Sequence, residues 1–450
     1  MKRRGVRKSG TAFVSGAMSH LRSNSISLLA TRLGSLSYRR RMNSLKVLII
    51  PFIVLPAFAA ESDWPEFRGK TGQGISAAAQ VPLKWSTTEN VAWKVEVPGK
   101  GWSSPVVAAG KIYLTTAMGE PKSGATLHAV CFDAKDGRLL WNTEIFKAAA
   151  GATSAMHQKN SLASPTPIVT ADRLFVHFGH MGSAALDLTG KVLWKHNSIP
   201  YEPTHGNGGS PVLAGGLLIF SCDAAPDPII AALDAGTGAI RWKTPRDTTA
   251  RKKFSFSTPL VVGDQVISPG SGFVGGYDVK TGKEVWRAGY GEGYSVIPRP
   301  VVADGLVFVS SSFDKAVLKA IRLAGAKGDV TESHVAWTLQ KGAPHTPSMI
   351  ISGDNLFCVS DAGIVTCADF HTGEVRWTER IPGNYSASPV LAEGRIYFQS
   401  ETGIGTVIKA DSKFEVLATN TLDEPTLSSP AFIDGAVILR SEKHLWRFGK

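Results

Sequence analysis

Hydrophobic residues along this chain recur in short runs rather than at helical spacing, and the runs follow one repeated order. A small or polar residue and a proline precede an apolar pair, a turn containing Gly or Asp follows, and a second apolar run comes next. Each unit predicts a β-hairpin, because short β-branched runs around such turns favour antiparallel strands. The repeated prolines are Pro105, Pro165, Pro211, Pro259, Pro300, Pro347, Pro389 and Pro430.

A second landmark follows later in each unit. An Asp is followed by a Gly four residues on and by a Trp four residues after that, as in Asp133, Gly137 and Trp141. The Asp can bond the turn amides, the Gly supplies a positive φ, and the Trp begins the next strand with a large apolar face. We therefore expect structural, blade-docking roles for Trp141, Trp194, Trp242, Trp286, Trp337 and Trp377.

The period of the repeat identifies the architecture. The prolines from residue 105 to residue 430 recur every ~46 residues on average, which is typical of one four-stranded propeller blade. The last unit lacks a fourth strand, and residues 91–97 form a strand with no blade before it. Pairing the two would complete the final blade and remove the open edges.

The predicted fold class is therefore all-β, an eight-bladed β-propeller of four-stranded antiparallel blades, closed by the N-terminal strand. The propeller is assigned to residues 88–450, and residues 61–87 form an N-terminal extension expected to pack on its outside. Two blades should be irregular. The fifth carries an insertion at residues 324–333, and the seventh, around residues 411–417, lacks the Gly and the Trp.

The Asp-x-x-[Thr/Asp]-Gly-x-x-x-Trp repeat resembles the tryptophan-docking motif of the pyrroloquinoline quinone (PQQ) type propellers. The opening residues Asp63-Trp64-Pro65-Glu66-Phe67-Arg68-Gly69 are similar to the start of many secreted members. The resemblance covers residues 63–450. The family includes quinoprotein alcohol and glucose dehydrogenases and also the non-catalytic lipoprotein of the outer-membrane β-barrel assembly machinery, so the resemblance is specific for fold and leaves function open.

Two functions follow from this resemblance. A quinoprotein enzyme implies PQQ held with Ca²⁺ or a lanthanide by Glu and Asn side chains, a catalytic Asp, a stacking Trp and a disulfide between adjacent cysteines. No two cysteines are adjacent here, and the segments before the repeat prolines hold few carboxylates: Glu292, Asp423 and Glu424. We therefore expect no cofactor and a non-catalytic binding or scaffold module, with an unidentified protein or small-molecule partner; a PQQ-dependent oxidoreductase with Ca²⁺ is the alternative.

Basic charge is confined to the start of the chain. The formal net charge is +12, but 11 of the 49 Lys and Arg residues lie within residues 1–60, which contain no Asp or Glu. The remainder is nearly neutral, so we expect no nucleic-acid partner. The composition, 43% hydrophobic and 19% charged, is that of an ordinary globular protein and excludes disorder.

Residues 1–60 are interpreted as a leader or signal peptide. Lys46 precedes the apolar run 47–55, and the small residues 57–60 follow, in the order of a signal peptide and its cleavage site. The run is too short and too interrupted by proline to be a transmembrane segment. Met42 is an alternative start. We predict a periplasmic or extracellular monomer that is not a lipoprotein, because Ala60 and Glu61 stand at the cleavage site where a lipoprotein needs Cys.

The segments before the repeat prolines should converge on one face of the central channel. They are polar, with basic, amide and aromatic side chains that suit an anionic or sugar-like ligand. Simple solvation of strand ends is the competing explanation for such polarity. The candidate ligand-binding residues at this mouth are His157, Lys159, Asn160, His205, Asn207, Lys253, Tyr294, Arg299, His345 and Tyr385.

No motif in the chain has the spacing of a metal site, a nucleophile elbow or a phosphate-binding loop, so no metal or catalytic residue is assigned. Export would permit disulfides. Cys358 and Cys367 are a disulfide candidate, because a two-residue turn at residues 362–363 would place them opposite each other on a hairpin. Two reduced, packed cysteines are the equal alternative. Cys131 and Cys222 have no candidate partner.

Overall fold

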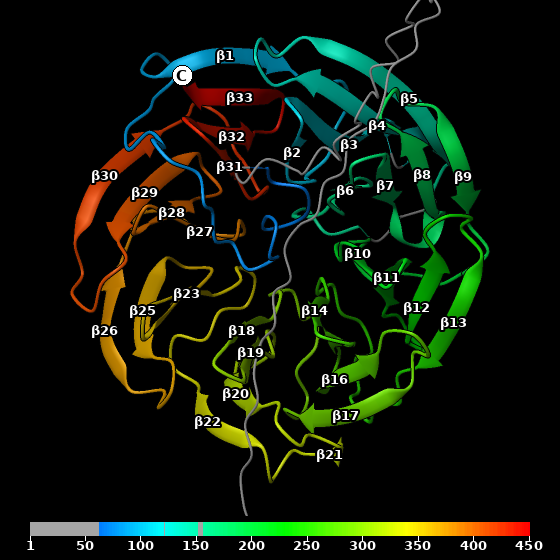
Figure 1. The fold of residues 1–450 in the computed structure, drawn as a ribbon, viewed down its shortest axis with the longest axis vertical. Helices are drawn as coiled ribbons and strands as arrows, with labels where there is room; N and C mark the ends of the chain where they lie inside the picture. Colours follow the sequence, from blue (N-terminus) through cyan, green and yellow to red (C-terminus); the bar gives the residue numbers. More distant parts are fainter. Residues whose placement is uncertain (1–62, 121, 152–155) are drawn as a thin grey trace, which may run out of the picture. The chain divides into compact units, whose positions relative to one another are not determined.

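The hydrophobic runs of the repeat form short strands that pair antiparallel in groups of four. The structure is a computed structural model that describes residues 63–450 apart from residue 121 and residues 152–155. The predicted leader, residues 1–60, lies outside the described residues. Eight four-stranded groups follow one another around a central axis (Figure 1), which confirms the predicted all-β, eight-bladed propeller.

Each blade begins beside the axis with a strand of two or three residues and runs outward to the rim. Because the proline before this innermost strand lacks an N–H, it suits the start of an edge strand. A 3-10 turn, η1 (Gly179–Met181), joins the second and third strands of blade 2. Blades 1 to 4 consist of β2 (Val106–Ala108), β3 (Lys111–Glu120), β4 (Gly124–Asp133) and β5 (Leu139–Ala148); β6 (Ile168–Val169), β7 (Arg173–His177), β8 (Ser183–Asp187) and β9 (Val192–His196); β10 (Val212–Ala214), β11 (Leu217–Cys222), β12 (Ile229–Asp234) and β13 (Ile240–Pro245); and β14 (Leu260–Val262), β15 (Gln265–Pro269), β16 (Phe273–Asp278) and β17 (Glu284–Gly289).

The second half of the ring repeats this arrangement. Its fifth blade contains the predicted insertion, and part of that insertion forms β21 (Gly328–Asp329), which pairs parallel with β17 of blade 4. Blades 5 to 8 consist of β18 (Val301–Ala303), β19 (Leu306–Ser310), β20 (Leu318–Arg322) and β22 (Val335–Leu339); β23 (Ile350–Ser352), β24 (Asn355–Val359), β25 (Ile364–Asp369) and β26 (Val375–Arg380); β27 (Val390–Ala392), β28 (Arg395–Gln399), β29 (Ile404–Lys409) and β30 (Val416–Thr421); and β31 (Ala431–Ile433), β32 (Ala436–Arg440), β33 (His444–Gly449) and β1 (Val91–Glu96).

The N-terminal strand closes the ring as the sequence predicted. β1 pairs antiparallel with β33, with Val95 opposite Leu445 and Lys94 opposite Trp446. Blade 8 therefore takes three strands from the end of the chain and its outermost strand from the beginning. Closure leaves no open interface between the first and last blades and so removes exposed edges.

Indole side chains join neighbouring blades at the rim. A tryptophan of one blade donates from Nε1 to a backbone carbonyl in the turn of the next blade. Except for Trp377, whose partner turn lacks a Gly, the ring also lies on that turn's Gly; a Cβ at Gly238 would stand 2.6 Å from the Trp194 ring. The donors and acceptors are Trp93 and Ala134 (3.2 Å), Trp141 and Leu188 (3.2 Å), Trp194 and Ala235 (3.0 Å), Trp242 and Val279 (3.0 Å), Trp337 and Phe370 (3.0 Å), and Trp377 and Asp411 (3.4 Å).

Two of these positions differ from the expected pattern. Trp93, which the motif search missed because β1 has no preceding Asp–Gly turn, docks blade 8 onto blade 1. Trp286 donates instead to Gln265 of its own blade (2.9 Å), since the insertion in blade 5 replaces the Asp–Gly turn that would accept the bond. Its indole is still buried between blades.

The N-terminal extension supplies the tryptophan that blade 7 lacks. Ala418 pairs with Val407, at the position where Trp377 pairs with Cys367 in blade 6. Trp85 fills the space, with its ring stacked on Tyr397 of blade 7 (6.2 Å between centroids) and on Phe448 of blade 8 (5.6 Å). The in-blade tryptophans lie 5.8–6.2 Å from the equivalent aromatic residues. Trp85 is therefore the docking residue of this interface, although it lies outside the repeat.

Replacing Trp85 with Ala should lower the free energy of unfolding by about 3–5 kcal/mol, because the change leaves a cavity between blades 7 and 8. Trp85→Phe, which keeps a ring at the interface, should lose less. Urea denaturation of the full chain, followed by intrinsic fluorescence and circular dichroism, measures both. Equal stability of Trp85→Ala and the unchanged protein would show that Trp85 does not dock these blades.

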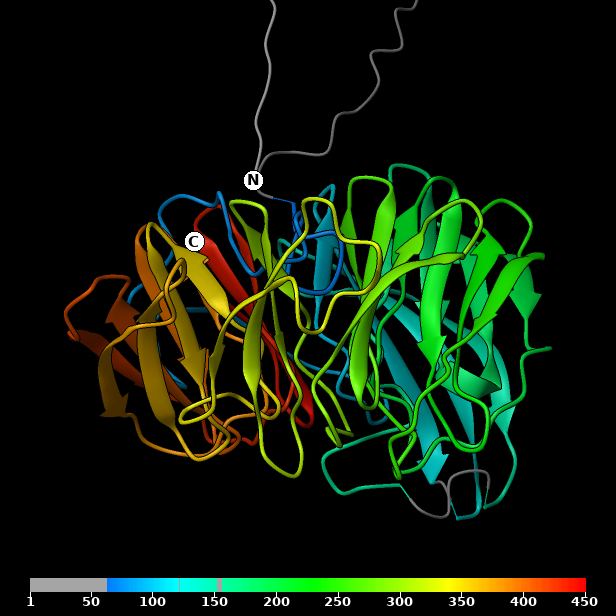
Figure 2. The same cartoon turned by 90° about the horizontal axis from the view of Figure 1, so that it is seen from below.

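The first part of the extension closes one end of the central channel, rather than packing only on the outside as predicted. Trp64 forms a β-bridge with Val107 of blade 1, and Ile75 forms one with Leu391 of blade 7. The N–H of Val169 in blade 2 donates to the Pro65 carbonyl (2.9 Å). Figure 2 shows the segment, in blue, at one face of the ring. The innermost strands expose backbone groups toward the axis, and this segment pairs with them.

The candidate disulfide between Cys358 and Cys367 is not formed, and both cysteines are free and buried. Ser360 pairs with Ile364, so the turn contains three residues rather than two and the register shifts by one. Cys358 therefore lies opposite Thr366, and Cys367 lies opposite Phe357. A one-residue shift turns the two thiols toward opposite faces of the blade. The alternative of two reduced, packed cysteines is the one observed.

Candidate functional site

The starts of the innermost strands and the connectors between blades enclose a cavity of about 550 Å³. Phe67 of the extension is one of the residues that line it. The other lining residues come from the innermost strand starts and from the connectors between blades. A cavity of this volume suits a small organic ligand. We call it the funnel.

A ring of hydroxyl groups, which we call the hydroxyl belt, surrounds the axis of the funnel. Its members lie two residues before the first strand of seven of the blades. Each hydroxyl oxygen accepts a hydrogen bond from the backbone N–H of the equivalent residue in the preceding blade. The acceptors are Thr166, Ser210, Thr258, Ser348, Ser388, Ser429 and Ser104, at 2.9–3.0 Å. All seven line the funnel. A proline usually stands between the belt residue and the first strand. In blade 2 this proline is Pro167 rather than Pro165, and in blade 6 Met349 takes its place.

Arg299 occupies the eighth position of the belt, in blade 5. The sequence placed this residue at the mouth, but its side chain is buried and points to the extension. Its guanidinium donates to the Pro259 and Phe67 carbonyls and pairs with Glu66 (3.2 Å). Burial raises the pKa of Glu66, and Arg299 opposes that rise. A single change in the repeat, from hydroxyl to guanidinium, therefore ties the extension to the ring.

Aromatic rings form a curved row along one side of the funnel. Their centroids follow each other at 5.7, 5.4, 5.4, 6.3 and 5.0 Å. The rings lie in connectors between blades, except that Phe313 lies in the loop between β19 and β20. We call this row the aromatic crescent; it consists of His157, His205, Phe254, Tyr294, Phe313 and His345. Edge-to-face packing holds these rings in place.

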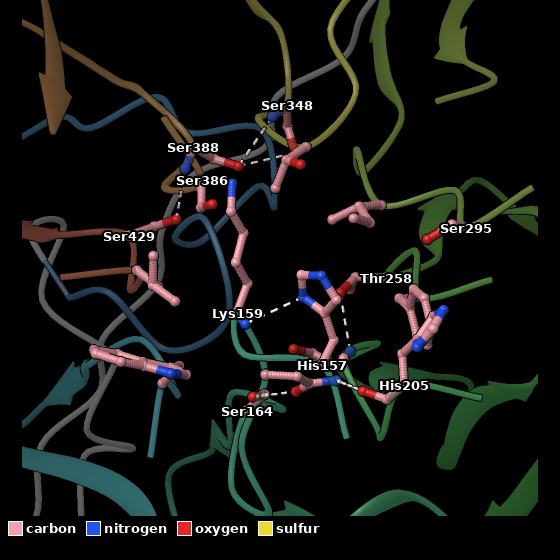
Figure 3. A pocket seen from close by; sticks show the side chains of 18 of the residues that line it. His157, Lys159, Ser164, His205, Thr258, Ser295, Ser348, Ser386, Ser388 and Ser429 are labelled. Atoms are coloured by element: carbon pink, nitrogen blue, oxygen red, sulfur yellow. Dashed lines mark hydrogen bonds between the residues drawn. The ribbon is translucent and has the colours of Figure 1, made fainter. Parts of the chain in front are cut away.

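Charged and polar side chains form the other side. Lys159, Asp361 and Ser386 line the funnel, and Glu401 is bonded to two of them. We call these four residues the polar wall. Lys159 extends from the His157 side of the funnel toward Ser386 (Figure 3), and its Nζ pairs with Glu401 of blade 7 at 2.6 Å. Ser386 donates to the same carboxylate (2.6 Å). Asp361 accepts from the backbone N–H (2.9 Å) and the hydroxyl (2.7 Å) of Thr346.

Five of the ten residues predicted for the mouth line the funnel: His157, Lys159, Asn160, His205 and Tyr294. His345 is not a lining residue, but its ring packs on Phe313, which is one. The sequence did not single out Phe254, Phe313, Asp361 or Glu401. The only sequence feature that these four residues share is a position in a loop between strands. The sequence does not show which of these loops face the axis.

The other four predicted residues lie elsewhere. Arg299 is described above. Tyr385 is buried in the core, where its hydroxyl donates to the Pro382 carbonyl (2.6 Å). Burial raises the pKa of Tyr385 to about 12. Asn207 is buried and bonded to Phe178 and His180. Lys253 donates to the Pro226 carbonyl (3.3 Å), away from the funnel. Side chains alternate in extended segments, so neighbours in the same connector face opposite ways.

The donors of the funnel do not fit a PQQ–metal pair. Ca²⁺ and lanthanide ions need several oxygen ligands that converge on one point. Among the described residues, no three His, Cys, Asp or Glu side chains are grouped so that they could hold a metal ion. The carboxylates of Asp361 and Glu401 are already engaged by Thr346 and by Lys159 and Ser386.

Together, tryptophan-docked blades, a ring closed by the N-terminal strand and an axial funnel define a propeller of the PQQ-like class. A family model described as outer membrane protein assembly factor BamB matches residues 82–221, 204–379 and 329–414. The chain therefore belongs to this family, which confirms the resemblance seen in the repeat.

Similar proteins include enzymes as well as the assembly factor. The chain is 29% identical over 155 residues to the lanthanide-dependent methanol dehydrogenase of Methylorubrum extorquens, covering 30% of this chain and 24% of that enzyme. It is 30% identical over 142 residues to methanol dehydrogenase [cytochrome c] subunit 1 of Paracoccus denitrificans, covering 27% and 22%. The chain thus aligns with about a quarter of the length of these enzymes.

Solved structures share the fold. BamB from Moraxella catarrhalis superposes with a TM-score of 0.56 at 14% identity, covering 80% of this chain and 98% of that one. A europium-containing methanol dehydrogenase superposes with a TM-score of 0.65 at 10% identity, covering 87% and 98%. At these identities the likeness concerns the fold alone.

Replacing Arg299 with Met should lower the free energy of unfolding by about 1–3 kcal/mol, because the Pro259 and Phe67 carbonyls and the partly buried Glu66 carboxylate would lose their hydrogen-bond donor. Adding Glu66→Gln should recover part of the loss. Arg251→Met is the matched control, since Arg251 pairs with Glu292 at the surface and should change stability by less than about 1 kcal/mol. Urea denaturation measures the three variants. An equal decrease in the free energy of unfolding for Arg299→Met and Arg251→Met would show that Arg299 does not hold the extension to the ring.

Proposed function

We propose that the protein is an exported, non-catalytic binding propeller whose funnel receives a ligand with hydroxylated rings, such as a saccharide. The observation that carries this proposal is the aromatic crescent facing the polar wall across one cavity of about 550 Å³. Ring faces supply apolar contact, while amide, carboxylate, ammonium and hydroxyl groups can bond sugar hydroxyls and fix their orientation.

A PQQ-dependent oxidoreductase is the weaker candidate. The partial match to methanol dehydrogenases favours it. The donor set of the funnel does not, because the described residues offer no cluster of oxygen ligands for the metal. The BamB family model, by contrast, matches segments that together span residues 82–414.

Export is part of the same proposal. It rests on the order of basic, apolar and small residues in the first 60 positions. Among the described residues, no helix is long and apolar enough to cross a membrane.

Tyr294→Ala should weaken saccharide binding at least ten-fold, because it removes a ring from the centre of the aromatic crescent. Tyr294→Phe keeps the ring and should bind nearly as well as the unchanged protein. Calorimetric titration of the full chain against a panel of acidic and neutral oligosaccharides measures both, with Leu193→Ala, an exposed rim residue, as the control. If no member of the panel binds, the proposed saccharide function fails.

PQQ should not bind in a metal-dependent manner. Absorption spectra and calorimetry with PQQ, with and without Ca²⁺ or La³⁺, test this expectation, together with dye-coupled oxidation of methanol and glucose. Saturable binding that requires the metal, accompanied by oxidation, would replace the proposed function with the oxidoreductase.

A further inference from the structure

The hydroxyl belt has hydrogen-bonding capacity that the protein itself does not use. Each belt hydroxyl accepts one backbone N–H, which occupies a lone pair and leaves the hydroxyl proton available. Ser388 donates its proton to Ser348 (3.0 Å). Within the described part of the chain, no acceptor pairs with the hydroxyl protons of the remaining six: Ser104, Thr166, Ser210, Thr258, Ser348 and Ser429.

These protons converge because propeller symmetry places their carriers at equivalent positions around one axis. Figure 3 shows Ser348, Ser388 and Ser429 on one side of the cavity and Thr258 on another, all bordering the same space. The backbone bonds fix the oxygen positions, so each hydroxyl can rotate only about its Cβ–O bond. A ring of donors with few acceptors favours a ligand group that accepts several hydrogen bonds at once.

Positive charge lies behind the belt at two places. Arg440 is fully buried and donates to Ser103 (2.8 Å), the residue before the belt member Ser104. Arg68 is buried and donates to the carbonyl of Met349, the residue after Ser348. Neither guanidinium has a carboxylate partner among the described residues, and each has two buried nitrogens without a hydrogen bond.

The negative charge nearby is already engaged. Glu66 pairs with Arg299, and Glu401 pairs with Lys159. Asp361, the one carboxylate among the described lining residues, accepts two hydrogen bonds from Thr346. Uncompensated guanidinium charges in a low-dielectric interior therefore favour an anion at the belt.

We propose that the hydroxyl belt is an anion subsite that receives a carboxylate of the funnel's ligand, which makes the ligand an acidic saccharide such as a uronate. The choice of a saccharide rests on the proposed function. The belt supplies O–H donors to the carboxylate, and the aromatic crescent packs against the sugar rings. Neutral hydroxyl donors hold the anion without a tight ion pair, so the ligand can leave the site as the free anion.

The experiment compares a uronate trisaccharide with its neutral counterpart by calorimetry, using the full chain. The uronate should bind at least ten-fold tighter. Ser210→Ala combined with Ser429→Ala removes two belt donors and should abolish most of that preference. Ser210→Thr combined with Ser429→Thr is the matched control and should keep it, because Thr166 and Thr258 already occupy equivalent positions.

A second measurement uses bromide in place of a saccharide and begins with the unchanged protein. Crystals of the full chain soaked in bromide should show an anomalous peak on the axis within hydrogen-bonding distance of the belt hydroxyls. Absence of that peak, or equal binding of the two trisaccharides, would overturn the anion subsite; a peak with equal binding would mean an adventitious ion only.

If neither trisaccharide binds, the proposed saccharide-binding function fails. The bromide experiment alone then shows whether the hydroxyl belt binds an anion. A peak that disappears in the double-alanine variant would keep the belt as an anion site. A peak that persists there would overturn it.

Discussion

Backbone N–H groups at the inner ends of the blades point along the ring, where no strand of their own blade can pair with them. The hydroxyl of the next blade accepts the hydrogen bond instead, at seven of eight positions. Because a buried N–H without a partner is costly, each blade depends on its neighbour. The belt therefore sets the spacing of the blades around the axis and, with it, the width of the funnel.

The tryptophans apply the same rule at the rim. Six indoles donate to a backbone carbonyl of the next blade and bury a large apolar face between the two blades. Where the repeat fails, other parts of the chain complete the contact, as Trp85 does for blade 7 and Trp93 does for blade 8. The extension and β1 are thus parts of the ring, because their contacts complete the blade interfaces.

A scaffold held at both its inner and outer circumference leaves the connectors free to vary. The aromatic crescent and the polar wall are both built on connectors or strand ends, while the belt belongs to the scaffold itself. BamB and a methanol dehydrogenase share this fold with the chain, and one fold can carry different sites. In the part of the chain that the structure describes, the connectors carry rings and hydrogen-bonding groups, and no three His, Cys, Asp or Glu side chains are grouped to hold a Ca²⁺ or lanthanide ion.

The sequence by itself determined the number of blades, the closure by β1 and the in-blade docking tryptophans, because each depends on local periodicity that a single chain displays. It also identified five funnel residues, since a connector before an innermost strand must reach the axis. Only the tertiary structure decided which side chains of a connector face inward, because a one-residue change in register or alternation reverses the face, as at Cys358 and Cys367. It alone brought Trp85 to blade 7, Glu66 to Arg299 and Lys159 to Glu401, because residues so far apart in the chain meet only when the ring closes.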